Sequence, residues 1–241
     1  MHVTLREIKK VAMKNSRIIE GFPGVGMVGT ICASYLAEKM GMELVASLHS
    51  PGFPPISAIH DYTPMSPARI YASKKHNAYV LFSEFVIPAN LVYALSQTIM
   101  DFAKAKKASA LYSLAGIATP NPESRIYGIA STPALSDSLK KKGVEIIKEG
   151  ATQGVSGLLI AECAARQFPA ANLLVQTAAP LDPVASARLL DFLSGHLDLG
   201  VDTAALKKQG EKVQARIQES MDKLKALHQD YQKMEENPMN G

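Results

Sequence analysis

The sequence predicts an α/β fold in which a central, mostly parallel sheet carries helices on both faces and a long helical segment follows at the C-terminus. Two observations support this prediction. Over residues 1–200, short runs rich in β-branched and aromatic residues alternate with longer runs of helical periodicity. Residues 203–236 lose that alternation and keep only helical spacing. We therefore expect a core domain at 1–200 and a C-terminal helical arm with a short flexible tail at 201–241.

The first strand and the first helix flank a glycine-rich turn. Residues 16–30 begin as an apolar strand candidate and run into four glycines and one proline. The helix expected next, at 27–40, has apolar side chains three and four residues apart, as one face of a helix requires. These side chains are Val28, Ile31, Cys32, Tyr35 and Leu36.

The middle of the chain continues the alternation. Strands are expected at 43–49, 68–73 and 110–119. The connection at 51–67 is long and broken by prolines. The run AYVLFSEF at 78–85 is the most continuous apolar run with aromatics, which is typical of a buried central strand. Pro88 then marks the first turn of a helix at 88–106, because proline is favoured at that position.

The elements of the last part of the core are marked by helix-end signals. Strand and helix candidates follow at 121–143, 151–167, 172–177 and 182–197. Three lysines and Gly143 indicate the end of one helix, and Gly154 and Gly157 lie around the start of the next. Asp182 is the expected N-cap of the last core helix, with Pro183 in its first turn.

The segment after a break at 200–202 has its apolar residues on a heptad. One row holds Leu206, Val213, Leu227 and Met234, and the other holds Ile217, Leu224 and Tyr231. Two interpretations stay open: a helix that packs back on its own domain, or an intersubunit coiled coil or protruding arm. In the second, the heptad residues from Val213 to Met234 form a protein-interaction surface.

Composition indicates a soluble, cytoplasmic protein with one sizeable core. The chain has 241 residues, 47% of them hydrophobic and 20% charged, with a net charge of +4. Its 26 basic and 22 acidic residues are interspersed, which argues against a nucleic-acid partner. No apolar run is long enough for a membrane, and the N-terminal segment lacks a secretory h-region. Cys32 and Cys163 lie in apolar helix candidates, which suits a reducing compartment.

The glycines at 24, 26 and 29 match the dinucleotide fingerprint GxGxxG. That fingerprint expects an acidic residue roughly 20 positions further on, and Glu43 is the nearest candidate. The same glycines would also suit a turn in which a helix packs closely on a sheet. Gly24, Gly26 and Gly29 are therefore candidate ligand-binding residues, with structural packing as the competing interpretation.

Two carboxylates near strand ends are the other ligand-binding candidates. In a parallel sheet, Glu20 and Glu84 would both lie toward the carboxyl ends of strands, where open α/β folds bind ligands. The alternative is that each of these carboxylates, like Glu162, bonds to a backbone N–H or a basic neighbour. We identify no catalytic residues, metal site or cofactor.

Signatures of catalysis are weak. The string GVSG at 154–157 is one residue short of a nucleophile elbow, so Ser156 is better explained as a helix-start residue. No lysine follows the glycine turn, which argues against a Walker-type ATPase. The histidines are scattered, and His60 beside Asp61 is the one adjacent pair of histidine and carboxylate, in the proline-broken connection. We expect that pair to be solvated.

Four segments together resemble the proteasome assembly chaperone family, in its archaeal, proteasome assembly chaperone two-like branch. They are GFPGVGMVG at 21–29, EF-x-IP at 84–88, GVSGLLI at 154–160, and DP-x-A-x-A-x-LL-x-x-L at 182–193. The resemblance runs from about Ser16 to the C-terminal helix, and the segments occur in the family's order at similar spacing.

The resemblance implies a phosphorylase- or hydrolase-like α/β domain without the catalytic residues of purine nucleoside phosphorylases. It also implies a homo-oligomer, and for some members an ATP-independent chaperone of proteasome alpha subunits. Members that bind proteasomes carry a C-terminal tail of a hydrophobic residue, Tyr and any residue. This chain ends in NPMNG, with Tyr231 ten residues before the end, so we do not expect docking through such a tail.

The sequence thus predicts a non-enzymatic, homo-oligomeric, protein-binding scaffold whose partners are itself and proteasome alpha subunits or other client proteins. The alternative is a nucleotide- or nucleoside-binding protein, or a hydrolase or transferase, with its site at the glycine-rich turn.

Overall fold

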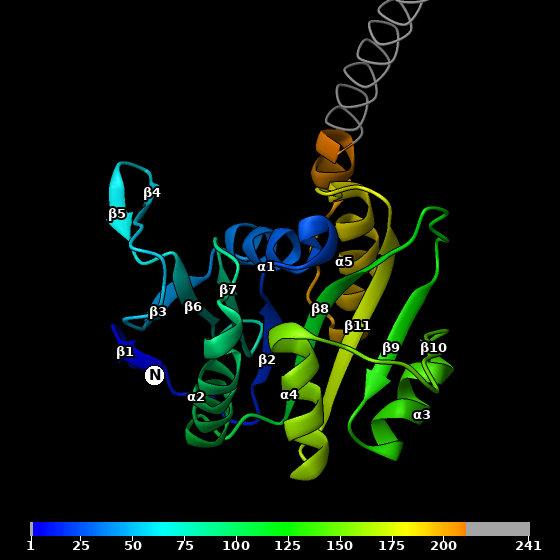
Figure 1. Cartoon of the computed structure of the whole chain (residues 1–241), viewed down its shortest axis with the longest axis horizontal. Helices are drawn as coiled ribbons and strands as arrows, with labels where there is room; N and C mark the ends of the chain where they lie inside the picture. The colour runs from blue at the N-terminus through cyan, green and yellow to red at the C-terminus, as the bar shows by residue number, and fades with distance from the viewer. Residues whose placement is uncertain (1, 211–241) are drawn as a thin grey trace, which may run out of the picture.

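The computed structural model describes residues 2–210, and the predicted α/β architecture is confirmed (Figure 1). A nine-stranded sheet has the order β1-β3-β6-β7-β2-β8-β11-β9-β10. Its four central strands are parallel: β7 (Ala78–Ser83), β2 (Arg17–Gly21), β8 (Ala110–Ala118) and β11 (Ala170–Thr177). The apolar run at 78–85 is therefore an interior strand.

The outer strands make the sheet mixed instead of mostly parallel. On one side, β6 (Ala68–Ser73), β3 (Glu43–His49) and β1 (Thr4–Glu7) each pair antiparallel. On the other side, β9 (Ile126–Ala130) is antiparallel to β11, and β10 (Glu145–Ile146) is parallel to β9. The four-residue link between β6 and β7 allows only a hairpin, because a parallel crossover needs a dozen or more residues.

The helices cover both faces of the sheet, as predicted. One face carries α1 (Val28–Lys39), α3 (Pro133–Lys141) and α5 (Pro183–Leu197), and the other carries α2 (Val92–Ala105) and α4 (Gly154–Ala165). None of the helices among residues 2–210 combines the length and apolarity needed to cross a bilayer.

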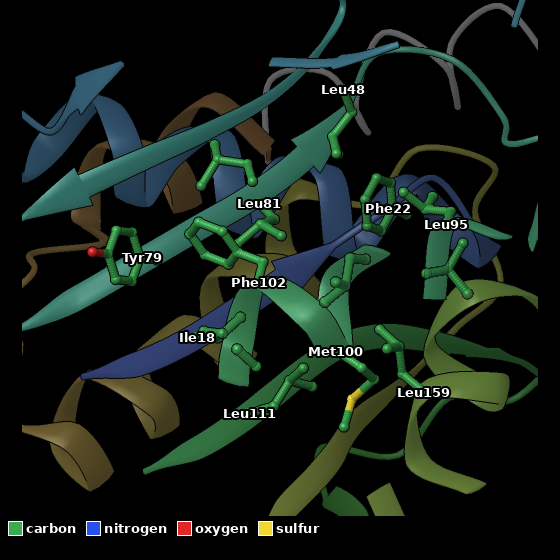
Figure 2. Packing of buried hydrophobic residues seen from close by; sticks show 14 of the residues in the cluster. Ile18, Phe22, Leu48, Tyr79, Leu81, Leu95, Met100, Phe102, Leu111 and Leu159 are labelled. Carbon is green, nitrogen blue, oxygen red and sulfur yellow. The ribbon is translucent and has the colours of Figure 1, made fainter. Parts of the chain in front are cut away.

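Alternation along the strands divides the core between these two faces. In β2, Ile18 packs toward α2 and α4, and Ile19 packs toward α1 and α5. Figure 2 shows Ile18 among Leu81, Leu111, Phe102 and Leu159 on the first of these faces. The free thiols of Cys32 and Cys163 are buried, one in each cluster.

Two elements differ from the sequence prediction. The proline-broken connection contains a separate hairpin, β4 (Ala58–His60) and β5 (Thr63–Met65), with Pro64 opposite Ile59. Proline is tolerated there because this two-stranded sheet has two open edges. Pro88 has ψ 135°, so it precedes a short 3-10 turn and α2 begins only at Val92.

Helix-end predictions are confirmed where side chains define the ends. The Asp182 carboxylate accepts a hydrogen bond from the Ala185 N–H at 2.8 Å, and Pro183 is the first residue of α5. Gly143 and Gly154 have positive φ angles of 82° and 74°.

Residues 204–210 are helical and pack against α5. Leu206 is buried in the α1 and α5 cluster, and Lys207 Nζ lies 2.5 Å from Asp191 Oδ2. A Cβ on Gly210 would lie 2.9 Å from Pro183 Cβ. The first residues of the C-terminal segment are thus fixed to the core domain.

Candidate functional site

The glycine turn joins β2 to α1 by direct contact between backbones. A Cβ on Gly21 would lie 2.0 Å from the carbonyl oxygen of Gly29, and a Cβ on Gly29 would lie 2.3 Å from that of Leu114. A Cβ on Gly116 in β8 would lie 2.3 Å from the carbonyl oxygen of Val25. The turn therefore rests on the ends of β2 and β8 at a distance that only glycine permits.

The other two fingerprint glycines, Gly24 and Gly26, differ in how closely their surroundings pack against them. Gly24 is exposed and a Cβ there would meet nothing within 4 Å. Gly26 has φ +64°, and a Cβ there would lie 2.7 Å from Thr177 Cγ2. Both glycines line an open depression of about 650 Å³ at the carboxyl ends of β8 and β11.

The surroundings of that depression do not favour a phosphate group. None of its lining residues carries a charge. Behind the turn, the Asp182 N–H donates to the Gly26 carbonyl at 2.9 Å, and Thr177 Oγ1 donates to the Asp182 carboxylate at 2.6 Å. A carboxylate so close to the turn would repel an anion.

Glu43 does not serve the glycine turn as the fingerprint requires. It pairs with Ala72 of β6, which in turn pairs with Tyr79 near the start of β7. This places Glu43 three strands from β2 and level with its beginning, whereas the turn follows the end of β2. Its carboxylate contacts Lys9 Nζ at 2.8 Å on the surface.

Glu20 is fully buried beneath the first turn of α4. Ser156 Oγ donates to its two carboxyl oxygens at 3.3 and 3.2 Å, and the Phe22 N–H donates at 3.1 Å. Burial raises the pKa of Glu20 to about 7, and the hydrogen bonds from Phe22 and Ser156 oppose that rise only in part. Ser156 therefore begins a helix, as predicted, and also links α4 to the sheet.

A row of polar residues extends from Glu20 across the sheet. Glu20 pairs with Ser113 of β8, and Ser113 pairs with Asn172 of β11. Asn172 is buried, and its amide has no hydrogen-bond partner among residues 2–210. Glu20 and Ser113 lie at the boundary between β2 and β8, where the chain reverses its direction of winding and open α/β folds bind ligands, and Asn172 lies one strand further on. In this chain α4 covers the position.

Glu84 lies on the other face of the sheet, so the structure does not bring the two candidate carboxylates together. It contacts Arg69, whose strand partner Phe82 packs on the α1 side. Arg69 is only 2% exposed, and its guanidinium lies over the rings of Phe82 and Tyr71, 5.3 and 5.9 Å from their centroids. The carboxylate of Glu84 thus offsets a buried positive charge.

The remaining polar candidates also have protein partners. His60 Nε2 lies 2.7 Å from Glu84 Oε1, so its carboxylate partner is Glu84 instead of its neighbour Asp61. Glu162 accepts from Arg166 and from Gln97 at 2.8 and 3.0 Å. Among residues 2–210, no group of histidine, cysteine, aspartate and glutamate side chains could hold a metal ion.

Exposed apolar side chains of the β4–β5 hairpin are the surface feature that the sequence analysis missed. Ile59 is 72% exposed and Tyr62 is fully exposed at the hairpin's turn. Alternation of polar and apolar residues is weak there, and the five prolines at 51–67 indicated an irregular connection. The predicted interaction residues Val213, Ile217, Leu224, Leu227, Tyr231 and Met234 lie outside the described part of the chain.

The chain is similar to known proteins over most of its length. The family model described as "PAC2 family" matches residues 18–221. An uncharacterized protein of Methanocaldococcus jannaschii is 30% identical over 214 residues, which cover 88% of each chain.

Solved structures also match. Pyrococcus furiosus PbaA, described as an archaeal homolog of proteasome-assembly chaperone, superposes with a TM-score of 0.83 at 27% identity, covering 98% of both chains. Pyrococcus furiosus PbaB, described as an archaeal proteasome activator, has the same fold, with a TM-score of 0.79 at 20% identity over 91% of this chain and 99% of PbaB.

Proposed function

The chain belongs to the PAC2 family, and on that premise we propose that it is a non-enzymatic, homo-oligomeric scaffold that assists proteasome assembly by binding alpha subunits without ATP. The observation that carries the proposal is the match to PbaA over 98% of both chains. At that coverage and 27% identity, a chaperone-like role is the function the similarity supports best.

Close packing at the carboxyl ends of β2 and β8 supports the non-enzymatic part of this proposal. In α/β enzymes the crevice at this edge holds the substrate. Here the backbone of Val25 rests on Gly116, and Glu20 is covered by Ser156 of α4. We infer that Gly29 of the fingerprint, together with Gly21, serves packing of α1 on the sheet. Binding of a nucleotide in the depression beside Gly24 and Gly26 is the second candidate function.

The C-terminal segment is the proposed contact with client proteins. Its first residues are fixed to α5 by Leu206, Lys207 and Gly210, so they set the direction in which the chain leaves the core. A binding segment that starts from a rigid base has less freedom to lose on binding. We propose that the heptad residues beyond it, from Val213 to Met234, contact the partner.

Recovery of alpha subunits by the tagged full-length chain tests this function. The variant carries Val213→Ser, Ile217→Ser and Leu224→Ser, and the matched control carries Gln214→Ser, Gln218→Ser and Lys225→Ser. Without ATP, we expect the control to recover alpha subunits from the same organism as well as the unaltered chain does. The heptad variant should recover at least tenfold less. Equal recovery by both would exclude the heptad as the contact, and no recovery by the unaltered chain would contradict the chaperone function.

A further inference from the structure

The β4–β5 hairpin stands apart from the nine-stranded sheet (Figure 1, cyan). It forms a two-stranded sheet of its own, and such a hairpin is only marginally stable without further packing. Ile59 and Tyr62 nevertheless expose most of their apolar surface, and Ile56 just before the hairpin is 51% exposed. Exposed apolar groups on a projecting element indicate a contact with another protein.

The hairpin's turn holds Tyr62 outward at a conformational cost. Asp61 and Tyr62 form a two-residue turn with φ angles of 46° and 62°. Turns of this kind usually contain glycine or asparagine, because a Cβ is disfavoured at positive φ. An aromatic residue kept in this conformation is a strained position of the type found at binding sites.

The hairpin is fixed to the main sheet close to its turn, because His60 precedes the turn and pairs with Thr63. His60 at the end of β4 contacts the carboxylate of Glu84, which also contacts the buried Arg69 of β6. Arg69 Nη2 lies 3.3 Å from His60 Nε2. Three charged or polar groups from three segments therefore hold the hairpin in one orientation, so its exposed side chains are preorganised for a contact.

A depression of about 610 Å³ lies beside the base of the same hairpin. Its apolar walls include Leu48, Phe53, Pro54 and Met65, and the imidazoles of His2 and His49 also line it. The tip of the hairpin presents the complementary groups, an apolar pair in Ile59 and Tyr62 and a carboxylate in Asp61.

We propose that the tip of this hairpin docks into the depression of a second copy of this chain, about a two-fold axis. Tip and depression lie at opposite ends of one short hairpin, so two antiparallel hairpins would place each tip beside the other molecule's depression. Such an isologous contact closes on itself. Apolar side chains then meet apolar walls, and the carboxylate of Asp61 meets the histidines of the second copy. The inference deepens the proposed homo-oligomer by naming a surface distinct from the C-terminal segment.

Light scattering of the full-length chain after size exclusion tests the surface. The variant carries Ile59→Ser and Tyr62→Ser, and the matched control carries Val86→Ser and Tyr93→Ser, which are also exposed but lie outside the tip and the depression. We expect the tip variant to associate at least tenfold more weakly than the control and the unaltered chain, with an unchanged circular dichroism spectrum. An unchanged mass for the folded tip variant would overturn the docking.

Cross-linking identifies the contact itself. One chain carries Tyr62→Cys and a second carries Pro54→Cys, and the native cysteines are buried. After mixing and mild oxidation, we expect a disulfide-linked dimer that contains one of each variant. Absence of this dimer would contradict the docking.

The two measurements also separate this inference from the proposed function. If the unaltered chain recovers alpha subunits but the tip variant keeps the mass of the unaltered oligomer, the chaperone function is supported and the docking is contradicted. A monomer mass for the unaltered chain in light scattering would contradict both the docking and the homo-oligomer.

Discussion

The sequence suggests a binding site at the glycine turn and none at the β4–β5 hairpin, and the structure indicates the reverse. The turn has the letters of a nucleotide-binding motif, yet its backbone is pressed against β2 and β8 and a carboxylate lies behind it. The hairpin comes from a proline-broken connection without a motif, yet it exposes Ile59 and Tyr62. The comparison teaches that glycine spacing reports close packing, whereas exposed apolar groups on a fixed element report binding.

Alanine substitutions in the glycine turn should have the largest effect on stability. Gly29→Ala would place a Cβ 2.3 Å from the Leu114 carbonyl, so α1 would have to move away from β8. We expect a loss of about 3 kcal/mol or more in the free energy of unfolding, measured by denaturant titration. Gly24→Ala is the matched control, since its Cβ meets nothing, and it should change stability by less than about 0.5 kcal/mol. Equal effects would mean that the turn is not close-packed.

Removal of the Glu84 carboxylate, which contacts His60 of the hairpin, should have the next largest effect. Glu84→Ala leaves the guanidinium of Arg69 buried without its counter-charge, which we expect to cost about 2 to 3 kcal/mol. Glu43→Ala removes an exposed partner of Lys9 and should cost less than about 1 kcal/mol. Thermal or chemical unfolding of both variants checks the difference, and similar losses would show that Arg69 does not depend on Glu84.

Glu20 should make stability depend on pH. Its pKa in the folded chain is about 7 against 4.5 for a free carboxyl, so the folded state binds more protons between these values. The stabilisation from the protonated group is complete below about pH 4.5 and is lost as the pH rises through 7, by about 3 kcal/mol in all.

Glu20→Gln removes this titration and keeps the shape of the side chain. We expect the variant to be more stable than the unaltered chain at pH 8, and the free energy of unfolding to vary less between pH 5 and 8. The exposed Glu38→Gln is the control and should keep the original pH dependence. An unchanged pH profile in Glu20→Gln would show that Glu20 ionises without penalty.

A glycine in the hairpin's turn should have a small stabilising effect. Tyr62 has φ 62°, so Tyr62→Gly relieves the cost of a Cβ at that angle, although glycine also gains entropy in the unfolded chain. We expect a net gain of about 0.5 kcal/mol at a concentration where the chain is monomeric. A clear loss of stability there would mean that the Tyr62 ring packs within its own molecule.

Nucleotides and nucleosides should have the smallest effect. A specific ligand at 100 times its dissociation constant would stabilise the fold by about 2.7 kcal/mol. We expect no shift in melting temperature with mononucleotides, dinucleotides or nucleosides. A shift that disappears in a variant carrying Gly24→Asp at the rim of the depression would restore the nucleotide-binding candidate.

The sequence predicts the α/β class because strand and helix periods alternate, and side-chain caps such as Asp182 determine helix ends locally. It does not predict which strands are neighbours, so the mixed pairing and the row from Glu20 to Asn172 could not be foreseen. Glu20 and Glu84 both lie near the carboxyl ends of parallel strands, as expected, and strand alternation and the contact with Arg69 place them on opposite faces of the sheet. The hairpin was missed because prolines usually exclude strands, and its edges are open.

Native mass spectrometry of the chain isolated from its own cells tests the central claim most directly, because one spectrum reports both protein partners and small ligands. We predict assemblies of this chain with itself and with proteasome alpha subunits. The mass of each assembly should equal the sum of its protein chains, without the added mass of a nucleotide. A monomer that carries a nucleotide, and no protein partner, would contradict this prediction.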